Sequence, residues 1–243
     1  MSYSVYTHVE RPDLAERAAQ AGDEVWPEYN RHGDVVNRFW RRMRVTFPEL
    51  QFVLYDEEHD DLVAEGHTLA LPWDGSEEGL PAGFDGIFER SFGDEPSTAL
   101  CAMAAEIWPS HQGAGLAPRL LELMGQIGRS HGYADLLAAV RPSWKARYPL
   151  VPIDAYAQWQ REDGLPFDPW IRVHVRMGAE ILRPEPRSLK ISGTVAEWED
   201  WTQMQFPVNG EYVFPEGLTT VSIDRDRDAG LYYEPNVWLR HRL

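Results

Sequence analysis

Cysteine is almost absent from this chain, because Cys101 is the single cysteine among 243 residues. One thiol cannot form an internal disulfide, and its position within an apolar run predicts a small buried side chain. Long hydrophobic runs are missing as well. No segment approaches the roughly 18 apolar residues that span a bilayer, and residues 1–19 contain no apolar signal segment. These absences predict a cytoplasmic protein that does not enter a membrane.

Positive charge is also scarce, since 23 Lys and Arg stand against 39 Asp and Glu, a formal net charge of −16. Nucleic acids and anionic membranes are bound by surfaces with an excess of positive charge. The charge balance therefore argues against both as partners and favours a cationic small molecule. A chain of this length buries roughly 70–75% of its unfolded surface, so we expect one large domain, alone or with an extension.

Several common catalytic motifs are missing. The chain has no Gly-Lys-Ser/Thr loop, no three-glycine dinucleotide fingerprint, no His-x-x-x-His spacing and no Gly-x-Ser-x-Gly. Residues 224–230 resemble a calcium loop, but Ala229 stands where that loop needs glycine, so we predict a hairpin turn. Metal-dependent and serine-hydrolase chemistry are disfavoured, and we expect no metal cofactor.

The most informative segment is a glycine-rich turn between an apolar strand and an amphipathic helix. Residues 100–107 are almost continuously apolar, as in a strand covered on both faces. After the turn, Leu120, Leu121 and Met124 recur at helical spacing. The backbone N–H groups of residues 113–117 would point out of the helix N-terminus, where unpaired donors and the helix dipole attract an anion. The segment predicts a phosphate cradle, with a pyrophosphate as its ligand.

This turn resembles a family signature. The pattern Gln112-x-x-Gly115-x-Ala117, with Pro109 three residues before it, is similar to the Gln/Arg-x-x-Gly-x-Gly/Ala motif of the GCN5-related N-acetyltransferase superfamily. In that family the motif opens the helix after the fourth strand and binds the pyrophosphate of coenzyme A. The resemblance implies acetyl-CoA or another acyl-CoA as cosubstrate. The residues implied to bind it are Ile107, Trp108, Gln112, Gly113, Ala114, Gly115, Leu116, Ala117 and Arg119. Further cations that could offset its 3′-phosphate are Arg141, Lys145 and Arg147.

The order of predicted elements resembles the acetyltransferase fold through about residue 141. Predicted strands are 2–9, 51–55, 62–71, 98–107, 134–140 and 179–189, and predicted helices are 12–21, 34–47, 116–131 and 168–177. The implied class is α/β (α+β), with a mixed, mostly antiparallel central sheet flanked by helices. We expect residues 1–191 to form the acyl-CoA-binding domain, with an insertion at about 141–167. Residues 192–243 are then a β-rich C-terminal extension packed on the same domain, and residues 72–95 a long loop.

Two residues are the main candidates for chemistry. In the family, a tyrosine in the helix before a closing glycine protonates the departing CoA thiolate, and here His174 stands at that position before Gly178. With an ordinary pKa near ~6.5, its imidazole could act as acid or base, and the competing interpretation is a core histidine. Glu106 ends the central strand and is a candidate base whose pKa an apolar setting raises. The resemblance thus implies an N-acyltransferase in which the amine of a small molecule attacks the thioester directly.

Two alternatives stay open. The segment 168–179, with its Asp-Pro start and His174-x-x-x-Gly178-Ala179 end, is similar to acetyltransferase-like decarboxylases of malonyl- or methylmalonyl-CoA. In those proteins a histidine acts with a nearby Ser or Thr, for which Ser143 and Thr98 are the candidates. The other alternative is a noncatalytic acyl-CoA-binding module whose extension serves a partner. A homodimer is compatible with each function.

Overall fold

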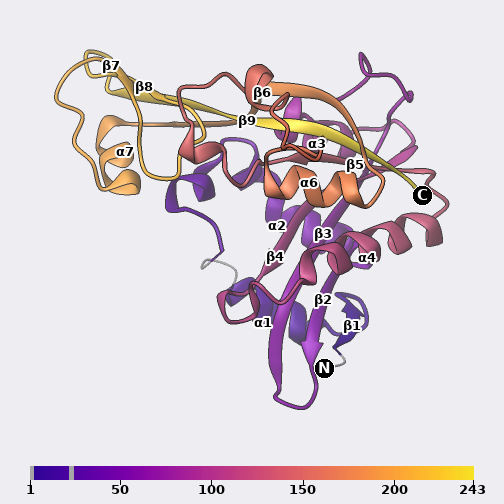
Figure 1. The fold of residues 1–243 in the computed structure, drawn as a ribbon. Helices are drawn as coiled ribbons and strands as arrows, with labels where there is room; N and C mark the ends of the chain where they lie inside the picture. Colours follow the sequence, from indigo (N-terminus) through magenta and orange to yellow (C-terminus); the bar gives the residue numbers. More distant parts are fainter. Residues whose placement is uncertain (1–2, 22–24) are drawn as a thin grey trace.

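The computed structural model describes residues 3–21 and 25–243 (Figure 1). Within these residues, nine strands form one sheet in the order β1-β2-β3-β4-β5-β9-β8-β7, and β6 pairs with β9. Only the β4–β5 pair is parallel among the strand pairs of the described residues. The predicted α/β class and mostly antiparallel sheet are therefore confirmed. The strands are β1 (Ser4–Thr7), β2 (Gln51–Asp56), β3 (Asp61–Leu71), β4 (Ala99–Ile107), β5 (Asp135–Val140), β6 (Glu180–Gly193), β7 (Gly210–Tyr212), β8 (Val221–Asp224) and β9 (Ala229–Arg242).

Helices cover both faces of the sheet. On one face, the apolar stripe of α4, with Leu120, Leu121 and Met124, packs against the strands, and α6 lies beside it. On the other face, α2 and α3 bury Met43 and Phe88. The α-helices are α1 (Pro12–Ala21), α2 (Val36–Thr46), α3 (Gly83–Ser91), α4 (Leu116–Ser130), α5 (Ile153–Tyr156), α6 (Pro169–Arg176) and α7 (Val195–Thr202). Short 3-10 helices are η2 (Glu28–His32), η3 (Pro48–Leu50), η4 (Pro109–His111) and η5 (Lys145–Arg147).

The sheet opens between β4 and β5. These parallel strands pair only over residues 100–102 and 136–138, although β4 continues to Ile107 and β5 to Val140. At the same level the register between β3 and β4 shifts, which leaves Met103 as an extra residue in β4. A bulge of this kind bends its strand and increases the local twist. The carboxyl-terminal ends of β4 and β5 therefore diverge and leave a gap in the sheet.

The C-terminal strand is central to the sheet rather than peripheral. β9 pairs with β5 through residues 237–242 and with β6 along most of its length. The predicted boundary at residue 192 consequently falls within β6. The segment between β6 and β9 forms its own aromatic cluster around Trp198, Phe214 and Tyr232, at one end of the long β6–β9 pair (Figure 1). Within it, Asp224 pairs with Ala229, which confirms the predicted hairpin turn.

The local predictions hold best for elements with a strong periodic pattern. Helix α1 has the predicted bounds, and Cys101 is fully buried, as expected. The main omission is α3, which lies in the stretch expected to be a loop. Gly83 and Gly86 lower its helix propensity, and contacts distant in sequence hold it, since the N–H of Phe84 donates to Ser188 Oγ (2.8 Å). In the described part of the chain, no helix is both long enough and apolar enough to cross a membrane.

Candidate active site

The predicted phosphate turn does join β4 to α4. Gly113 and Gly115 have φ angles of 79° and 72°, and Gly115 is the N-cap of α4. Glycine adopts this left-handed conformation freely, whereas other residues lose roughly 1–2 kcal/mol. A Cβ built on either glycine meets nothing within 4 Å, so the space beside the turn is open. Gln112 donates from Nε2 to the carbonyl of Ile107 (3.0 Å) and ties the turn to β4. The geometry suits an anion held by backbone N–H groups.

The backbone of β4 beyond the bulge offers a second set of polar groups. The N–H of Trp108 donates to Val63 of β3 (3.2 Å), and hydrogen-bonded pairs alternate along antiparallel strands. With Ile107 opposite Ala64 and Ala105 opposite Gly66, the N–H and C=O groups of Ala105 and Ile107 therefore point away from β3, toward the gap. Ile107 therefore presents backbone groups with which it could bind acyl-CoA, as the resemblance implies, and Ala105 presents the same groups.

Two other predicted cofactor residues are held by protein contacts. The N–H of Trp108 is paired with β3, its carbonyl accepts from His111 (2.8 Å), and its ring packs in the cluster with Leu14 of α1. The backbone N–H of Trp108 therefore already has a partner in β3, so it is not free for the acyl-CoA contact that the resemblance implies. Arg119 lies in the first turn of α4, where its Nη2 donates to the carbonyl of Tyr3 (2.9 Å).

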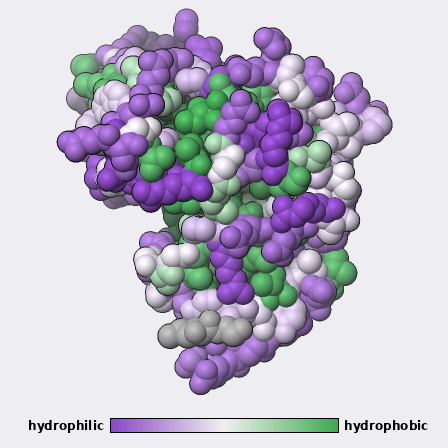
Figure 2. All heavy atoms as spheres, turned by 45° about the vertical axis from the view of Figure 1, so that its right-hand side comes forward, coloured by the Kyte–Doolittle hydropathy of each residue, from purple (hydrophilic) through white to green (hydrophobic). Residues whose placement is uncertain are grey.

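A cavity of about 860 Å³ occupies the gap between β4 and β5. From the α4 face it is lined by Met124 and Trp170, and from the opposite face by Trp26 and Trp40. Residues of both diverging strands complete its wall, so the cavity reaches from one face of the sheet to the other. Figure 2 shows apolar side chains gathered between two more polar regions of the surface. All three predicted catalytic residues line this one cavity: Glu106, Ser143 and His174.

His174 lies on α6 and is only 1% exposed. Its Nδ1 is 2.9 Å from Nε2 of His241 on β9, while its own Nε2 has no hydrogen-bond partner among the described residues. Burial, followed by the charge of His241, lowers the pKa of His174 to about 3. The expected pKa near ~6.5 is therefore wrong, because desolvation disfavours the imidazolium. The neutral ring can donate from Nε2 in the tautomer in which His241 donates to its Nδ1.

Ser143 follows β5 and lies beside the start of the same helix. Its N–H donates to Asp168 (3.2 Å), the residue whose carboxylate caps α6. Thr98 lies at the opposite end of β4, where its hydroxyl donates to the carbonyl of Trp73 (2.6 Å). Thr98 is absent from the cavity wall in the described residues. Of the two candidate partners of His174, the structure brings only Ser143 to the shared cavity.

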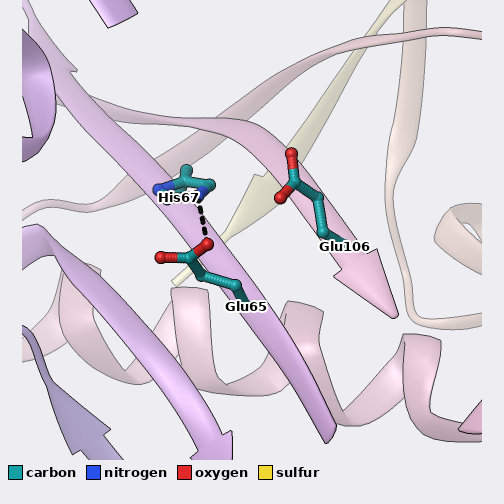
Figure 3. Close-up of side chains that lie close together, drawn as sticks. All are labelled: Glu65, His67 and Glu106. Atoms are coloured by element: carbon teal, nitrogen blue, oxygen red, sulfur yellow. Dashed lines mark ion pairs between the residues drawn. The ribbon is translucent and has the colours of Figure 1, made fainter. Parts of the chain in front are cut away.

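Glu106 is 4% exposed and lies on the sheet face opposite α4. Its Oε1 accepts a hydrogen bond from Trp26 Nε1 (2.7 Å). Desolvation raises the pKa of Glu106, as predicted, and the charge of His67 opposes this shift. Figure 3 shows Glu106 beside Glu65 and His67, which project from the neighbouring strand β3. Their ligand atoms lie within 4.8 Å of one another.

The neighbouring carboxyl, Glu65, has the opposite electrostatics. His8 (2.9 Å), Arg44 (2.8 Å) and His67 (3.3 Å) all lie at ion-pair distance from it. Desolvation raises the pKa of Glu65, but these neighbours outweigh it and hold the pKa well below its usual range. Glu65 is therefore a fixed anion, whereas Glu106 binds a proton more tightly. Adjacent carboxyl groups whose pKa values are driven apart are typical of acid–base sites.

The loop after β5 holds the three cations suggested for the 3′-phosphate. Lys145 is fully buried and donates from Nζ to the carbonyls of Tyr148 (2.8 Å) and Leu218 (2.6 Å), so that assignment is wrong. Arg147 lies over the ring of Trp144 (4.6 Å). Arg141 lines the cavity instead, where its Nε donates to Glu234 (3.1 Å).

Sequence reasoning missed most of the charged residues that surround Glu106. Glu65, His67 and Glu106 come from two strands and share no spacing motif, and Trp26 and Arg44 reach them from separate segments. The one usable signal was the presence of charged residues in otherwise apolar strands, since buried charges occur where they are paired or functional. The same signal is present in β3, where Glu65 and His67 interrupt an apolar strand.

No family model matches the chain. A curated relative, the arginine N-acetyltransferase avaD of Aspergillus versicolor, is 24% identical over 275 residues, which cover 99% of this chain and 94% of the relative.

Solved structures share the fold. The loading GNATL domain of CurA from Lyngbya majuscula has a TM-score of 0.66 at 18% identity, covering 100% of this chain and 98% of that one. The GphF GNAT-like decarboxylase in complex with isobutyryl-CoA has a TM-score of 0.59 at 18% identity, covering 98% of each chain. These similarities show that the chain has the fold of the GCN5-related N-acetyltransferases, and the turn at Gln112-x-x-Gly115-x-Ala117 stands where the resemblance to that superfamily implies it.

Proposed function

We propose that the chain is an acyl-CoA-dependent N-acyltransferase that transfers an acetyl group to an amine of a small molecule. The observation that carries the proposal is the cavity between β4 and β5, which has Glu106 on one face of the sheet and His174 on the other. Two substrates can therefore approach the same gap from opposite sides, as direct transfer requires. The similarity to an arginine N-acetyltransferase supports the same reaction and favours a cationic amine such as arginine.

The residues present fit acyl-CoA on the α4 side. The N–H groups around Gly113 and Gly115 would hold the pyrophosphate, and the outward-facing backbone of Ala105 and Ile107 would hold the pantetheine arm. Bound acyl-CoA supplies an activated thioester. The strands diverge next to this path, which leaves room for the thioester in the cavity.

Glu106 and His174 have complementary roles in this proposal. Glu106 accepts one proton of the incoming ammonium, directly or through water, and the free amine then forms a C–N bond as the C–S bond breaks. A second proton passes from the nitrogen to the departing thiolate, directly or through water, which gives the amide and free CoA. Its raised pKa makes it a better proton acceptor than an ordinary carboxylate. His174 donates a hydrogen bond from Nε2 to the thioester carbonyl or to the departing sulfur. Because its pKa is about 3, it acts as a neutral donor and not as an imidazolium acid.

The test is acyl transfer from acetyl-CoA to a panel of amines, followed by mass spectrometry of the products. The panel contains L-arginine, L-lysine, agmatine and spermidine. Glu106→Gln should lower kcat by roughly 10²-fold or more, within the range for a lost general base. The matched control is Glu122→Gln, at an exposed position of α4. Absence of any acylated amine, or full activity of Glu106→Gln, would overturn the proposal.

Decarboxylation of malonyl- or methylmalonyl-CoA is a second candidate, because Ser143 and the unpaired Nε2 of His174 line the same cavity. This reaction needs no amine. Conversion of malonyl-CoA to acetyl-CoA in the absence of an amine, abolished by His174→Phe, would establish it in place of transfer. If neither substrate turns over while CoA still binds, the noncatalytic module is the better description.

The proposal includes a cytoplasmic, metal-free enzyme. The transfer is a nucleophilic acyl substitution for which Glu106 and His174 supply the polar groups. The buried single thiol Cys101 is compatible with a reducing compartment.

A further inference from the structure

Arg141 lies where β5 ends, across the gap from Glu106. The parallel pairing places Ala102 opposite Ala138, so Glu106 is four residues beyond that pair on β4 and Arg141 three residues beyond it on β5. Both residues line the cavity. A cation and a protonatable carboxyl thus face the same opening from its two walls.

The guanidinium of Arg141 is held in one orientation by its neighbours. Nε donates to Glu234 Oε1 (3.1 Å), and Nη2 donates to Tyr29 Oη (2.9 Å) and to the carbonyl of Glu216 (3.0 Å). These partners come from β9, η2 and the loop before β8. Three elements distant in sequence therefore fix one side chain, as expected for a preformed binding group.

Glu234 is not free to bind the ammonium group of an acceptor, because both of its carboxylate oxygens already accept hydrogen bonds from the protein. Besides Arg141, it accepts hydrogen bonds from Asn30 Nδ2 (3.0 Å), Tyr29 Oη (3.0 Å) and Tyr232 Oη (3.3 Å), and it is 2% exposed. Its function in this arrangement is to position the guanidinium. By contrast, Nη1 of Arg141 donates to no residue in the described part of the chain, and a fifth of the side chain is exposed.

We propose that Arg141 binds the carboxylate of the acceptor, so that the acceptor is an amino acid and not a simple amine. The proposal rests on the acyl-transfer function above and names its substrate class. The free guanidinium nitrogen matches a carboxylate oxygen, a charge-assisted hydrogen bond. The amine of the same molecule then lies toward Glu106. A guanidinium and a carboxyl on facing walls suit a zwitterion better than a purely cationic amine.

The test compares each amino acid with the amine that lacks its carboxylate: L-arginine with agmatine, and L-lysine with cadaverine. Each kcat/KM ratio is measured within one protein preparation, so differences in folded fraction cancel. The wild-type ratio should favour the amino acid by roughly 10- to 100-fold, the range for a hydrogen bond between charged groups. Arg141→Lys keeps a cation beside Glu234 but loses the free Nη1, and its ratio should fall toward 1. Arg38→Lys, on the exposed face of α2 and outside the cavity, is the matched control and should keep the wild-type ratio.

The outcomes separate the two proposals. If no amine is acylated, the proposed function fails. If amines are acylated but the wild-type ratio is near 1, or the Arg141→Lys ratio is unchanged, the Arg141 assignment fails alone. Binding of CoA and of 3′-dephospho-CoA tests the competing phosphate role. If Arg141→Lys weakens CoA but not dephospho-CoA, Arg141 contacts the 3′-phosphate and the carboxylate assignment is wrong.

Discussion

The two halves of the cavity are built from different kinds of chemical groups. On the α4 side the wall is apolar side chains, a strand edge and a neutral buried histidine, with no ion pair among its described residues. On the α2 side Arg44 and Arg141 line the cavity, and each forms an ion pair, Arg44 with the buried Glu65 and Arg141 with Glu234. In the proposed function, the first half would offer backbone hydrogen bonds to acyl-CoA, and the second half would offer fixed charges to the acceptor.

This difference explains how the two halves tolerate change. An anion site made of backbone N–H groups depends on the φ angles of its glycines, so it is lost only when a substitution is incompatible with those angles. A charge network depends on each partner, because removal of one leaves the other buried and unpaired. Substitutions in the first half should change cofactor affinity, and those in the second half should change rate, pH dependence and selectivity.

Gly115→Glu, on the α4 side of the cavity, should have the largest effect. Gly115 has φ 72°, so a glutamate there is strained in the left-handed conformation. It also places a negative charge where we propose that an anion binds. The affinity for CoA, measured by calorimetry, should fall by at least about 10³-fold, since two or more charge-assisted hydrogen bonds are lost. Gly132→Glu is the control, because Gly132 has φ 81° and open space around it but follows the other end of α4. Equal loss of affinity in both variants would point to strain alone.

The next effect is that of His174→Phe, which removes the polar group of the otherwise apolar half. Its kcat should fall by roughly 10²–10³-fold, the cost of one lost transition-state donor, while CoA affinity stays within a few-fold of wild type. His59→Phe, in the exposed β2–β3 turn, should retain full activity. Wild-type turnover of His174→Phe with both acetyl-CoA plus amine and malonyl-CoA would make His174 a core residue only.

The sequence predicted the first half of the cavity far better than the second. The phosphate turn at Gln112, the strand before it and the helix after it are contiguous, so local periodicity and glycine spacing were sufficient. The contact between His174 and His241 spans 67 residues, and that between Tyr29 and Glu234 spans 205. Nothing in the spacing of residues encodes such contacts. The same reason explains why spacing alone predicts neither the contacts of Arg141 in the cavity nor the central position of β9.

A smaller effect concerns the pH dependence of the charged half. Since desolvation raises the pKa of Glu106, kcat should fall as the pH drops below that raised pKa, by up to about tenfold per pH unit. Glu106→Gln should remove this acid limb, and His174→Phe should leave it in place. Measurement of kcat at saturating substrate between pH 4.5 and about 9 gives both profiles. If His174→Phe loses the acid limb and Glu106→Gln keeps it, the titrating group is His174 and the assignment to Glu106 is wrong.

The smallest effect is on stability and tests whether His174 is truly neutral. Its pKa is about 3 in the folded chain and about 6.5 when unfolded, so the unfolded state binds more protons between these values. The stabilisation is complete above about pH 6.5 and is lost as the pH falls toward 3, by up to about 1.4 kcal/mol per pH unit. Urea denaturation at pH 7 and pH 5 should therefore show a larger loss for wild type than for His174→Phe, by roughly 2 kcal/mol. Other titrating groups are common to both proteins and cancel in this difference. Equal losses would mean that the imidazole is charged in the folded protein, and His174 would then belong with the charged half of the cavity.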